Sequence, residues 1–416
     1  MRILLISSQD YIHHPLPSRH HYIFERLAER HEIHVAHFHV NDNIPRETKL
    51  TVEETTMFPL KNLILHYTLN SPYHFYKFDK IIKENNIDII VAAHVLAGTA
   101  AILAGKRNNI PVLFDLKDWF PDSAAAYFKN KWLKKIVHDV VLNVTKYNLS
   151  NSTKITTVSP NLIKKLKDLG YVSQLITNGV DTKLFKPMPN QILRHKLGIS
   201  DTDFVIGFAG SIERWYNLQD LFTSYTLNNY NIKLLFVGGS LFTNYKLELE
   251  EMMRKYHMEH KVIFTGFIPY NYLPDYINCM DVCTIPLAPT QWKNIALPNK
   301  FFEYTACGKP ILTTNIPNIT EFNCSNTYVY NDKNEFEQHL KIIMDNKPKY
   351  NIDFTKQDWD YKAKEMENIL QDLIDMEEFY QKVGNKERFK ISNSKLDLTC
   401  AELSFNIKIF SCIYIS

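Results

Sequence analysis

The segment from residue 297 to residue 314 combines a cation, a carboxylate and a predicted helix start within a short stretch. Lys300 lies beside the helix start expected at Asn299, where free N–H groups and the positive end of the helix dipole favour a diphosphate. Glu303 lies one turn later, where a carboxylate can accept hydrogen bonds from sugar or ribose hydroxyls. These residue types predict a nucleotide-sugar site. Taken alone, the helix fits a purely structural role equally well.

Two aspartates in the first half of the chain follow an apolar strand predicted over 111–116. Asp115 and Asp118 therefore lie at the carboxyl end of that strand, where parallel sheets bind their ligands. We expect both to face an acceptor, with Asp118 acting on its hydroxyl as a base or as an orienting hydrogen-bond acceptor. Capping of the next helix is the alternative role for these carboxylates.

The elements that must position these residues alternate between strand and helix along the chain. An apolar strand over 2–7 and an amphipathic helix over 17–30 open a first series, which ends with a strand at 173–177. A second series begins with a strand at 204–209. The pattern predicts two doubly wound α/β units, with a ligand cleft where their strand ends face each other.

A segment with two prolines at 185–190 is typical of a linker, because proline stiffens a connection and donates no backbone hydrogen bond. We place an N-terminal, acceptor-binding domain at 1–186 and a C-terminal, nucleotide-sugar-binding domain at 187–358. A closing helix is predicted at about 359–380. Residues 381–416 form an extension for which the sequence predicts no definite structure.

The composition limits the function classes. The 416 residues are 45% hydrophobic and 22% charged, which is typical of a soluble globular protein. The formal net charge of +3 is too small to indicate a nucleic-acid partner. The six cysteines show no paired metal-ligand spacing, so we expect reduced thiols in a cytoplasmic protein. The amino terminus predicts a strand rather than a signal peptide, and no apolar run approaches the roughly 20 residues that span a bilayer.

The histidine-rich segment 31–39 invites a metal-binding interpretation. It coincides with a predicted strand, and its spacing places the rings on both faces of that strand. A closed metal site needs ligands that converge on one point. We therefore predict no metal site here or elsewhere in the chain.

Six phrases of the sequence resemble, in family order, those of glycosyltransferase family 4, whose members have the GT-B fold. They extend from the first strand-and-helix series through the linker into the second series. The phrases are Thr157-Val-Ser-Pro-Asn-Leu, Ile176-Thr-Asn-Gly-Val-Asp-Thr-Lys-Leu-Phe185, Phe208-Ala-Gly-Ser211, Leu235-Phe-Val-Gly-Gly239, Phe264-Thr-Gly-Phe267 and Leu297-Pro-Asn-Lys-Phe-Phe-Glu-Tyr304.

This resemblance implies two Rossmann-like domains facing across a cleft, with the closing helix crossing back onto the N-terminal domain. It implies that a sugar moves from a nucleoside diphosphate sugar to a glycan or lipid-linked acceptor. It also implies retention of anomeric configuration and no bound metal or other cofactor. With these implications, we predict that the donor-binding residues are Gly210, Ser211, Arg214, Gly238, Phe267, Pro298, Asn299, Lys300 and Glu303.

The sequence departs from the family pattern at the donor sugar. The family has two glutamates separated by seven residues, and Ile295 occupies the place of the first, while Glu303 matches the second. This departure removes one expected contact with the transferred sugar.

A second departure concerns the diphosphate. Members often have an Arg and a Lys after the glycine that matches Gly210, where this chain has Ser211 and Tyr216. We expect Arg214 and Lys300 to supply the positive charge instead, because a guanidinium can bind two phosphate oxygens at once.

On the acceptor side, Ser18, Arg19 and His20 occupy the place of the family's glycine-rich loop. Without those glycines, side-chain contacts are favoured over close backbone approach. His94 matches a position where the family often has a histidine near the donor sugar, and a core histidine is the alternative. The residues that we assign to catalysis are Asp118, His94 and Arg214.

The segment 128–136 alternates aromatic and basic residues on a predicted helix. A peripheral membrane contact would suit a lipid-linked acceptor, since each basic residue near an anionic surface contributes about 1 kcal/mol. An ordinary solvated helix face is the alternative. We expect a cytoplasmic location, with the inner face of the cell membrane as an open option.

Two other functions fit the same fold. The first is a catalytically inactive nucleotide-sugar-binding or scaffold protein, because expected Arg, Lys and Glu side chains are missing. The second is a sugar-nucleotide epimerase of the GT-B fold. A dehydrogenase is disfavoured, because the first strand is followed by Ser7-Ser-Gln-Asp-Tyr11 and not by a glycine fingerprint.

Overall fold

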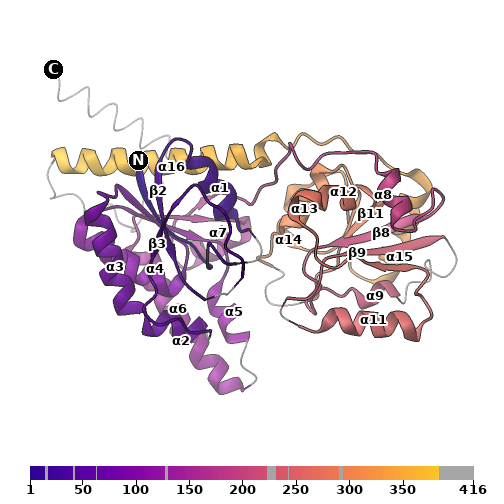
Figure 1. The fold of residues 1–416 in the computed structure, drawn as a ribbon, viewed down its shortest axis with the longest axis horizontal. Helices are drawn as coiled ribbons and strands as arrows, with labels where there is room; N and C mark the ends of the chain where they lie inside the picture. The colour runs from indigo at the N-terminus through magenta and orange to yellow at the C-terminus, as the bar shows by residue number, and fades with distance from the viewer. Residues whose placement is uncertain are drawn as a thin grey trace.

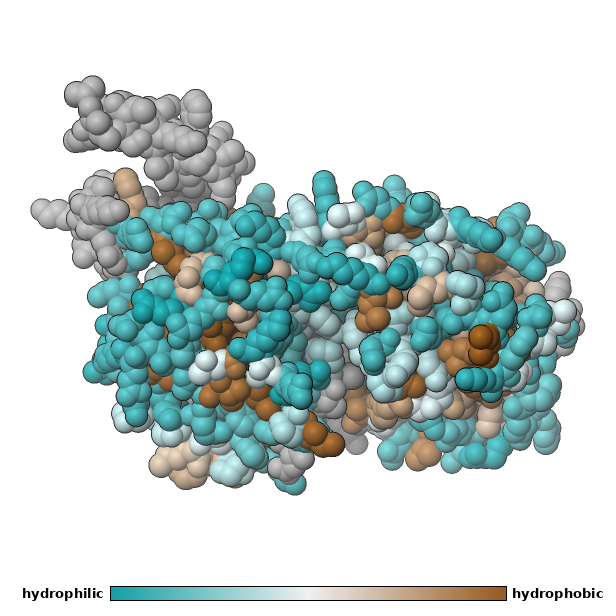
Figure 2. Space-filling model, turned by 45° about the horizontal axis from the view of Figure 1, so that its top comes forward, coloured by the Kyte–Doolittle hydropathy of each residue, from teal (hydrophilic) through white to brown (hydrophobic). Residues whose placement is uncertain are grey.

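The structure is a computed structural model that describes residues 1–14, 17–40, 43–61, 63–126, 130–222, 231–241, 243–289 and 294–383. The chain forms two α/β halves that lie side by side, each built around one parallel sheet (Figure 1). The face seen in Figure 2 is largely hydrophilic, with hydrophobic residues in small separate patches. This architecture is the doubly wound pair that the alternation of strands and helices predicts.

The N-terminal sheet has the strand order β3-β2-β1-β4-β5-β6-β7. Its strands are β1 (Arg2–Ile6), β2 (Glu32–His37), β3 (Thr51–Glu54), β4 (Ile89–Ala92), β5 (Val112–Leu116), β6 (Lys154–Thr157) and β7 (Gln174–Leu175). The helices of this half are α1 (Arg19–Leu27), α2 (Leu63–Leu69), α3 (Ser71–Glu84), α4 (Val95–Asn108), α5 (Phe120–Ala126), α6 (Lys131–Asn151) and α7 (Pro160–Asp168).

The C-terminal sheet has the strand order β10-β9-β8-β11-β12-β13. Its strands are β8 (Phe204–Ala209), β9 (Ile232–Val237), β10 (Val262–Phe264), β11 (Val282–Ile285), β12 (Ile311–Thr314) and β13 (Thr327–Tyr330). The helices that follow β7 are α8 (Gln191–Lys196), α9 (Gln219–Phe222), α11 (Tyr245–Lys255), α12 (Leu273–Asn278), α13 (Asn299–Ala306), α14 (Pro317–Phe322), α15 (Lys333–Asn346) and α16 (Trp359–Val383).

Helices cover both faces of the N-terminal sheet. Along β1, Ile3 and Leu5 pack in one core cluster with α1 and α16, whereas Leu4 and Ile6 pack in another with α3 and α4. Successive side chains of a strand point to opposite faces, so both faces must be apolar. The strand ends are therefore the part of the sheet that can present polar residues to a ligand.

The closing helix α16 crosses back onto the N-terminal half and runs along it (Figure 1). Trp359 at its start stacks on Tyr22 of α1, with ring centroids 4.8 Å apart. Further along, the Glu367 carboxylate accepts hydrogen bonds from Arg30 at 3.1 Å and from His31 at 2.7 Å. This stacked pair and this charged cluster add to the apolar packing between α16 and α1.

Some elements differ from the sequence prediction. The stretch after β2 contains β3 and α2, although its sequence shows no clear period. The helix predicted at 218–226 corresponds to α9, and residues 223–226 lie outside the described residues. Residues 384–416 of the predicted extension also lie outside them. The division at residue 186 and the roles assigned to the two domains stay predictions.

Within the described part of the chain, no helix has both the length and the apolarity to span a bilayer.

Candidate active site

Three glycine turns follow adjacent strands at the carboxyl edge of the C-terminal sheet. Gly210, Gly238 and Gly266 follow β8, β9 and β10, with φ values of +130°, +128° and +70°. The Gly238 N–H donates to the Gly266 carbonyl at 3.0 Å. A Cβ atom on Gly238 would lie 2.2 Å from the Gly210 carbonyl oxygen, so no other residue fits there. The three turns therefore form one compact backbone surface.

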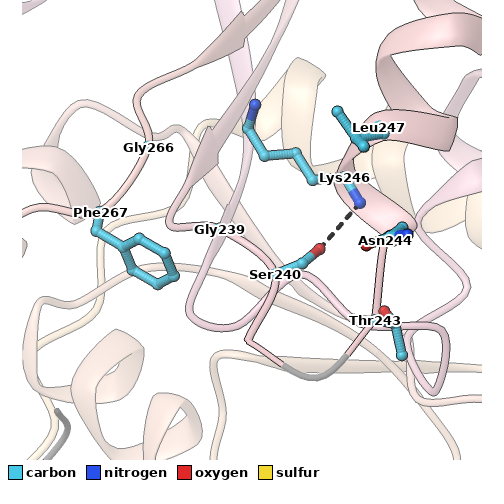
Figure 3. A pocket seen from close by; sticks show the side chains of 8 residues that line it. All are labelled: Gly239, Ser240, Thr243, Asn244, Lys246, Leu247, Gly266 and Phe267. Atoms are coloured by element: carbon cyan, nitrogen blue, oxygen red, sulfur yellow. Dashed lines mark hydrogen bonds between the residues drawn. The ribbon is translucent and has the colours of Figure 1, made fainter. Parts of the chain in front are cut away.

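A cavity of about 280 Å³ opens beside these turns (Figure 3). The Phe267 ring lies on one side of it, and the start of α11 lies on the other. The Ser240 hydroxyl accepts a hydrogen bond from the Lys246 N–H at 3.0 Å and so ties the loop after β9 to α11. The lining residues are Gly239, Ser240, Thr243, Asn244, Lys246, Leu247, Gly266 and Phe267.

Only Phe267 of this lining is among the residues predicted from the sequence. Its side chain is 59% exposed, which leaves an aromatic face available for stacking on a flat ligand. Gly238 forms the turn behind the cavity and does not line it. The loop residues Ser240 and Thr243 were missed, because short polar loop residues have no period that would single them out.

Helix α13 begins one residue earlier than predicted. Pro298, with φ −70° and ψ 140°, is the residue before the helix, and Asn299 is its first residue rather than its cap. Proline suits this place because it donates no N–H and its φ is already fixed. The Asn299 side-chain oxygen is buried and has no hydrogen-bond partner among the described residues. Gly308, with φ +66°, ends the helix as predicted.

Lys300 is buried between two aromatic rings beside the first glycine turn. Its Nζ lies 3.8 Å from the ring centroid of Tyr216 and 4.1 Å from that of Phe208. A Cβ atom on Gly210 would lie 3.1 Å from the same Nζ. Burial lowers the pKa of Lys300 to about 7, and the nearby Glu303 carboxylate partly opposes this shift. Tyr216 thus holds a cation from α13, although Tyr216 itself replaces an expected lysine.

Glu303 is buried one turn further along α13. The Tyr270 hydroxyl donates a hydrogen bond to it at 3.2 Å. Burial raises the pKa of Glu303 to about 7, while Tyr270 and Lys300 lower it. The Tyr270 ring also packs against Tyr22 of α1, with centroids 5.7 Å apart, so this carboxylate is linked to the N-terminal half. Tyr270, which begins a short 3-10 helix, was not predicted, because a lone tyrosine outside a periodic segment carries no signal.

Tyr304 fixes α13 to the sheet. Its hydroxyl accepts from the Ala209 N–H at 2.8 Å and approaches the Ala209 carbonyl oxygen at 3.3 Å. Ala209 is the last residue of β8 and precedes Gly210. The bond therefore sets the distance between the helix that carries Lys300 and the first glycine turn.

The two charged residues of the loop after β8, Glu213 and Arg214, have different surroundings. The Ser211 hydroxyl donates to the buried Glu213 carboxylate at 2.7 Å. Glu213 also accepts from the Leu241 N–H at 2.6 Å, which joins this loop to the one after β9. Arg214 is exposed and forms an ion pair with Glu248 of α11. A phosphate role for Arg214 stays a prediction, and it requires this exposed pair to open.

A buried charge cluster lies at the predicted acceptor side. Asp115 accepts from the His20 Nε2–H at 2.9 Å and from the Thr156 hydroxyl at 2.8 Å. The Arg19 Nε lies 3.7 Å from the same carboxylate. Burial alone would raise the pKa of Asp115, but Arg19 and the two hydrogen bonds lower it well below its usual range. Asp115 therefore stabilises neighbouring side chains and does not project freely from the strand end.

Arg19 is the least satisfied member of this cluster. Its three guanidinium nitrogens are buried and have no hydrogen-bond partner within the described ranges. Ser18 precedes α1, and its N–H donates to His21 Nδ1 at 2.9 Å, so Ser18 has a capping role. Burial lowers the pKa of His20, which the hydrogen bond to Asp115 partly offsets. Acceptor roles for these residues stay predictions.

The two N-terminal catalytic candidates differ in their surroundings. Asp118 is exposed just beyond the end of β5. His94 caps α4, where its Nδ1 accepts from the Ala97 N–H at 3.2 Å, and its ring stacks on Tyr67 at 3.7 Å. Burial lowers the pKa of His94 to about 3, so the ring is neutral and carries its proton on Nε2. His94 can therefore cap α4 through Nδ1 and donate a hydrogen bond from Nε2.

Two adjoining family matches cover most of the chain. Residues 20–184 match the family described as Glycosyltransferase Family 4, and residues 189–383 match Glycosyl transferases group 1. The chain belongs to the group 1 glycosyltransferases. The resemblance stated from the six sequence phrases is thereby confirmed.

Two curated glycosyltransferases are similar over part of their length. TuaH of Bacillus subtilis, whose name refers to teichuronic acid biosynthesis, is 25% identical over 225 residues, or 53% of this chain and 54% of TuaH. An uncharacterized glycosyltransferase of Methanocaldococcus jannaschii is 23% identical over 198 residues, or 44% of this chain and 48% of that protein. The matches span about half the length of these relatives.

Solved structures share the fold over nearly the whole chain. Sucrose-phosphate synthase of Thermosynechococcus elongatus has a TM-score of 0.66 at 17% identity, covering 92% of this chain and 98% of that one. HepE of Anabaena, solved with UDP-glucose, has a TM-score of 0.63 at 16% identity, covering 92% and 100%. These likenesses confirm the GT-B fold of this group 1 glycosyltransferase.

Ile295, at the place of the first family glutamate, lies in the contact between the two halves of this glycosyltransferase. Its side chain packs against the core cluster of the N-terminal half. Its carbonyl accepts from the Ser159 hydroxyl at 3.3 Å, and the neighbouring Asn294 carbonyl accepts from the Asn161 amide at 2.8 Å. An apolar residue at 295 is therefore a packing contact here.

Proposed function

We propose that this glycosyltransferase moves a sugar from a nucleoside diphosphate sugar to a hydroxyl of a glycan or lipid-linked acceptor. One observation carries the proposal. Helix α13 places a buried cation, Lys300, beside the turn at Gly210, and it carries a buried carboxylate, Glu303, one turn further along. A diphosphate needs the first group and a ribose needs the second.

The donor would extend along this edge of the sheet. Its base would occupy the cavity against Phe267, its ribose hydroxyls would donate to Glu303, and its phosphates would lie between Lys300 and the turn at Gly210. The N–H groups at the start of α13 and of Ser211 would add fixed positive ends where the leaving diphosphate gains charge. The UDP-glucose complex of HepE, which shares the fold, makes uridine donors the first to test.

The N-terminal half would supply the acceptor side. Asp118 is exposed and can accept a proton or a hydrogen bond from the attacking hydroxyl. His94 can donate from Nε2 to an oxygen of the sugar or the phosphate. The unsatisfied guanidinium of Arg19 suits an anionic group of the acceptor once the surrounding cluster opens. Retention of configuration and independence from metal belong to this proposal through the family resemblance.

Transfer is tested with radiolabelled donor and a membrane lipid extract. We expect label in the lipid or glycan fraction with at least one UDP or GDP sugar, and about 100-fold less with Asp118→Asn, within the range for loss of a general base. Glu259→Ala changes an exposed residue that does not line the cavity, and this matched control should transfer normally.

A scaffold function is the second candidate, and the packing of Ile295 favours it, because a sugar-contacting glutamate is missing. The same assay separates the two functions. Donor binding without transfer or donor hydrolysis, across UDP and GDP sugars, would support a scaffold and contradict the enzyme.

A peripheral membrane contact through α6 is a further part of the proposal. Residues 128 and 129 of the predicted segment lie outside the described residues. On α6, Trp132 is 74% exposed, and Leu133 and Ile136 are also exposed, close to Lys134 and Lys135. Apolar and basic side chains on one exposed helix suit an anionic bilayer surface such as the inner face of the cell membrane. Sedimentation with anionic liposomes at low salt should pellet the protein, and a protein that stays in the supernatant would contradict this contact.

A further inference from the structure

A group of histidines and carboxylates lies at the ends of the first three strands. Asp10 and His13 belong to the loop after β1, His37 is the last residue of β2, and Glu54 is the last residue of β3. None of them is among the predicted donor or acceptor residues. The histidine-rich strand alone places its rings on two faces, but the fold adds Asp10 and His13 from outside that segment.

The ligand atoms of this group converge. His13 Nδ1 lies 3.0 Å from His37 Nε2. Asp10 Oδ1 lies 3.6 Å from His37 Nε2, and Asp10 Oδ2 lies 3.7 Å from His13 Nδ1. Two nitrogen ligands at about 2.0–2.1 Å from a tetrahedral zinc ion lie roughly 3.3 Å apart. The observed separations bracket this value, so one ion fits between the three side chains after small shifts.

Three further hydrogen bonds hold the ligands in place. The His37 Nδ1–H donates to the Glu54 carboxylate at 2.7 Å, which leaves the Nε2 lone pair directed at His13 and Asp10. Metal-bound histidines usually donate their second ring N–H to a carboxylate in this way. Asp10 accepts from the N–H groups of Ile12 at 3.1 Å and His13 at 3.0 Å, so its carboxylate is already oriented.

Charge and ligand type also suit a divalent ion. The carboxylates of Asp10 and Glu54 offset two positive charges, and imidazole nitrogen with carboxylate oxygen suits zinc and related transition metals. His39 lies close by, with its ring centroid 5.4 Å from that of His13 and 5.5 Å from that of His37. It is therefore within reach as a fourth ligand after a side-chain rotation.

We propose that Asp10, His13 and His37 bind one divalent transition-metal ion, with zinc as the best match, and that Glu54 orients His37. His39 or a water molecule completes the coordination. The ion joins the loop after β1 to the ends of β2 and β3, and it takes no part in sugar transfer. An N–H···N hydrogen bond between the two rings, without metal, is the competing account of the same geometry.

The test is a zinc titration of the full chain, prepared without a histidine tag and stripped with a chelator. We expect one equivalent to bind in isothermal titration calorimetry, and bound cobalt to give the visible absorption of a tetrahedral site. His13→Ala, a change in a loop, should abolish both signals, and Glu54→Gln should weaken binding about 10- to 100-fold. His195→Ala, an exposed histidine on α8, is the matched control and should bind like the unmodified protein.

Circular dichroism of each variant shows whether it is folded, and His37→Gln serves as a second ligand variant if His13→Ala fails to fold. Absence of binding to the folded chain would favour the direct hydrogen bond and overturn the proposal. Zinc binding that persists in both folded ligand variants would place the ion elsewhere and overturn it equally.

Discussion

The charge of Lys300 in the proposed donor site depends on the residues around it. It lies between the rings of Phe208 and Tyr216, which attract a cation but exclude water. Burial lowers its pKa to about 7, so near neutral pH the side chain is only partly charged without a ligand. A bound diphosphate would favour the protonated form.

This leads to a pH prediction for donor binding. Above pH 7, nucleoside diphosphate binding must protonate Lys300, so affinity should fall from pH 7.5 to pH 9 by up to about tenfold per pH unit. Isothermal titration with UDP at several pH values measures it. Lys300→Met should bind UDP more weakly at pH 7.5 and should lose this decline. Glu303 becomes charged as pH rises, so its ionisation should favour the hydrogen bonds from the ribose and cannot cause the decline. A decline that persists in Lys300→Met would contradict the assignment.

We predict that Asp115 contributes mainly to stability and Asp118 mainly to catalysis. Asp115→Asn leaves the Arg19 guanidinium buried without its counter-ion, and breaking such a pair costs about 3–5 kcal/mol of unfolding free energy. Asp118→Asn changes an exposed side chain and should cost less than about 0.5 kcal/mol. Urea unfolding of both variants measures this difference. Equal stability of the two would show that the buried cluster contributes little.

At the residue scale, the sequence predicted that Lys300 and Glu303 share one helix, because α13 has a recognisable period and stop. Their roles in donor binding stay predictions, and most of the contacts around them could not be predicted. Tyr270 and Glu213 were missed, because their partners lie 33 and 28 residues away and no local pattern marks such pairs. The burial of Asp115 was also not predictable, since it depends on His20 and Thr156 from two other elements.

At the element scale, one charged cluster around Glu367 helps to hold α16 on the N-terminal half. Glu367 accepts from Arg30, His31 and Lys364, and the hydrogen bond from Arg30 is the main cause that lowers the pKa of Glu367 to about 2. A carboxyl whose pKa is lowered on folding stabilises the protein above its unfolded pKa. This contribution is lost as pH falls from about 4.5 towards 2.

Glu367→Gln should therefore lower the unfolding free energy by about 1.5–3 kcal/mol at pH 7, as for a hydrogen bond to a charged group. The difference from the unmodified protein should shrink as pH falls below 4.5. Urea unfolding at pH 7, 4 and 3 measures it, and Asp372→Asn, an exposed change on the same helix, is the control. A difference that stays constant with pH would contradict the role of this ionised carboxylate.

Element order was more predictable than element boundaries. Buried parallel strands are apolar runs, and α13 ends at Gly308 as its sequence predicts. The start of α13 was misplaced, because Pro298 and Asn299 both suit a helix start. Strand β3 was missed because it lies at the edge of its sheet, where alternating burial is weak.

At the scale of the whole molecule, the two halves meet through polar and apolar contacts around the proposed site. Ser159 and Asn161 of the N-terminal half hydrogen-bond the segment that carries Ile295, and Tyr22 packs on Tyr270. The two-unit architecture could be predicted from the repeated strand and helix pattern. These contacts could not, because they join residues more than a hundred positions apart in the sequence.

We propose that the C-terminal half binds the donor and that the N-terminal half acts on the acceptor. The most direct measurement is the thermal shift caused by UDP, GDP and their sugars in three variants, since a ligand that binds the folded state raises its stability. We predict that a nucleotide that stabilises the unmodified protein loses its effect in Glu303→Ala but keeps it in Asp118→Asn and in the control Glu259→Ala. A full shift in Glu303→Ala would contradict the placement of the donor on α13.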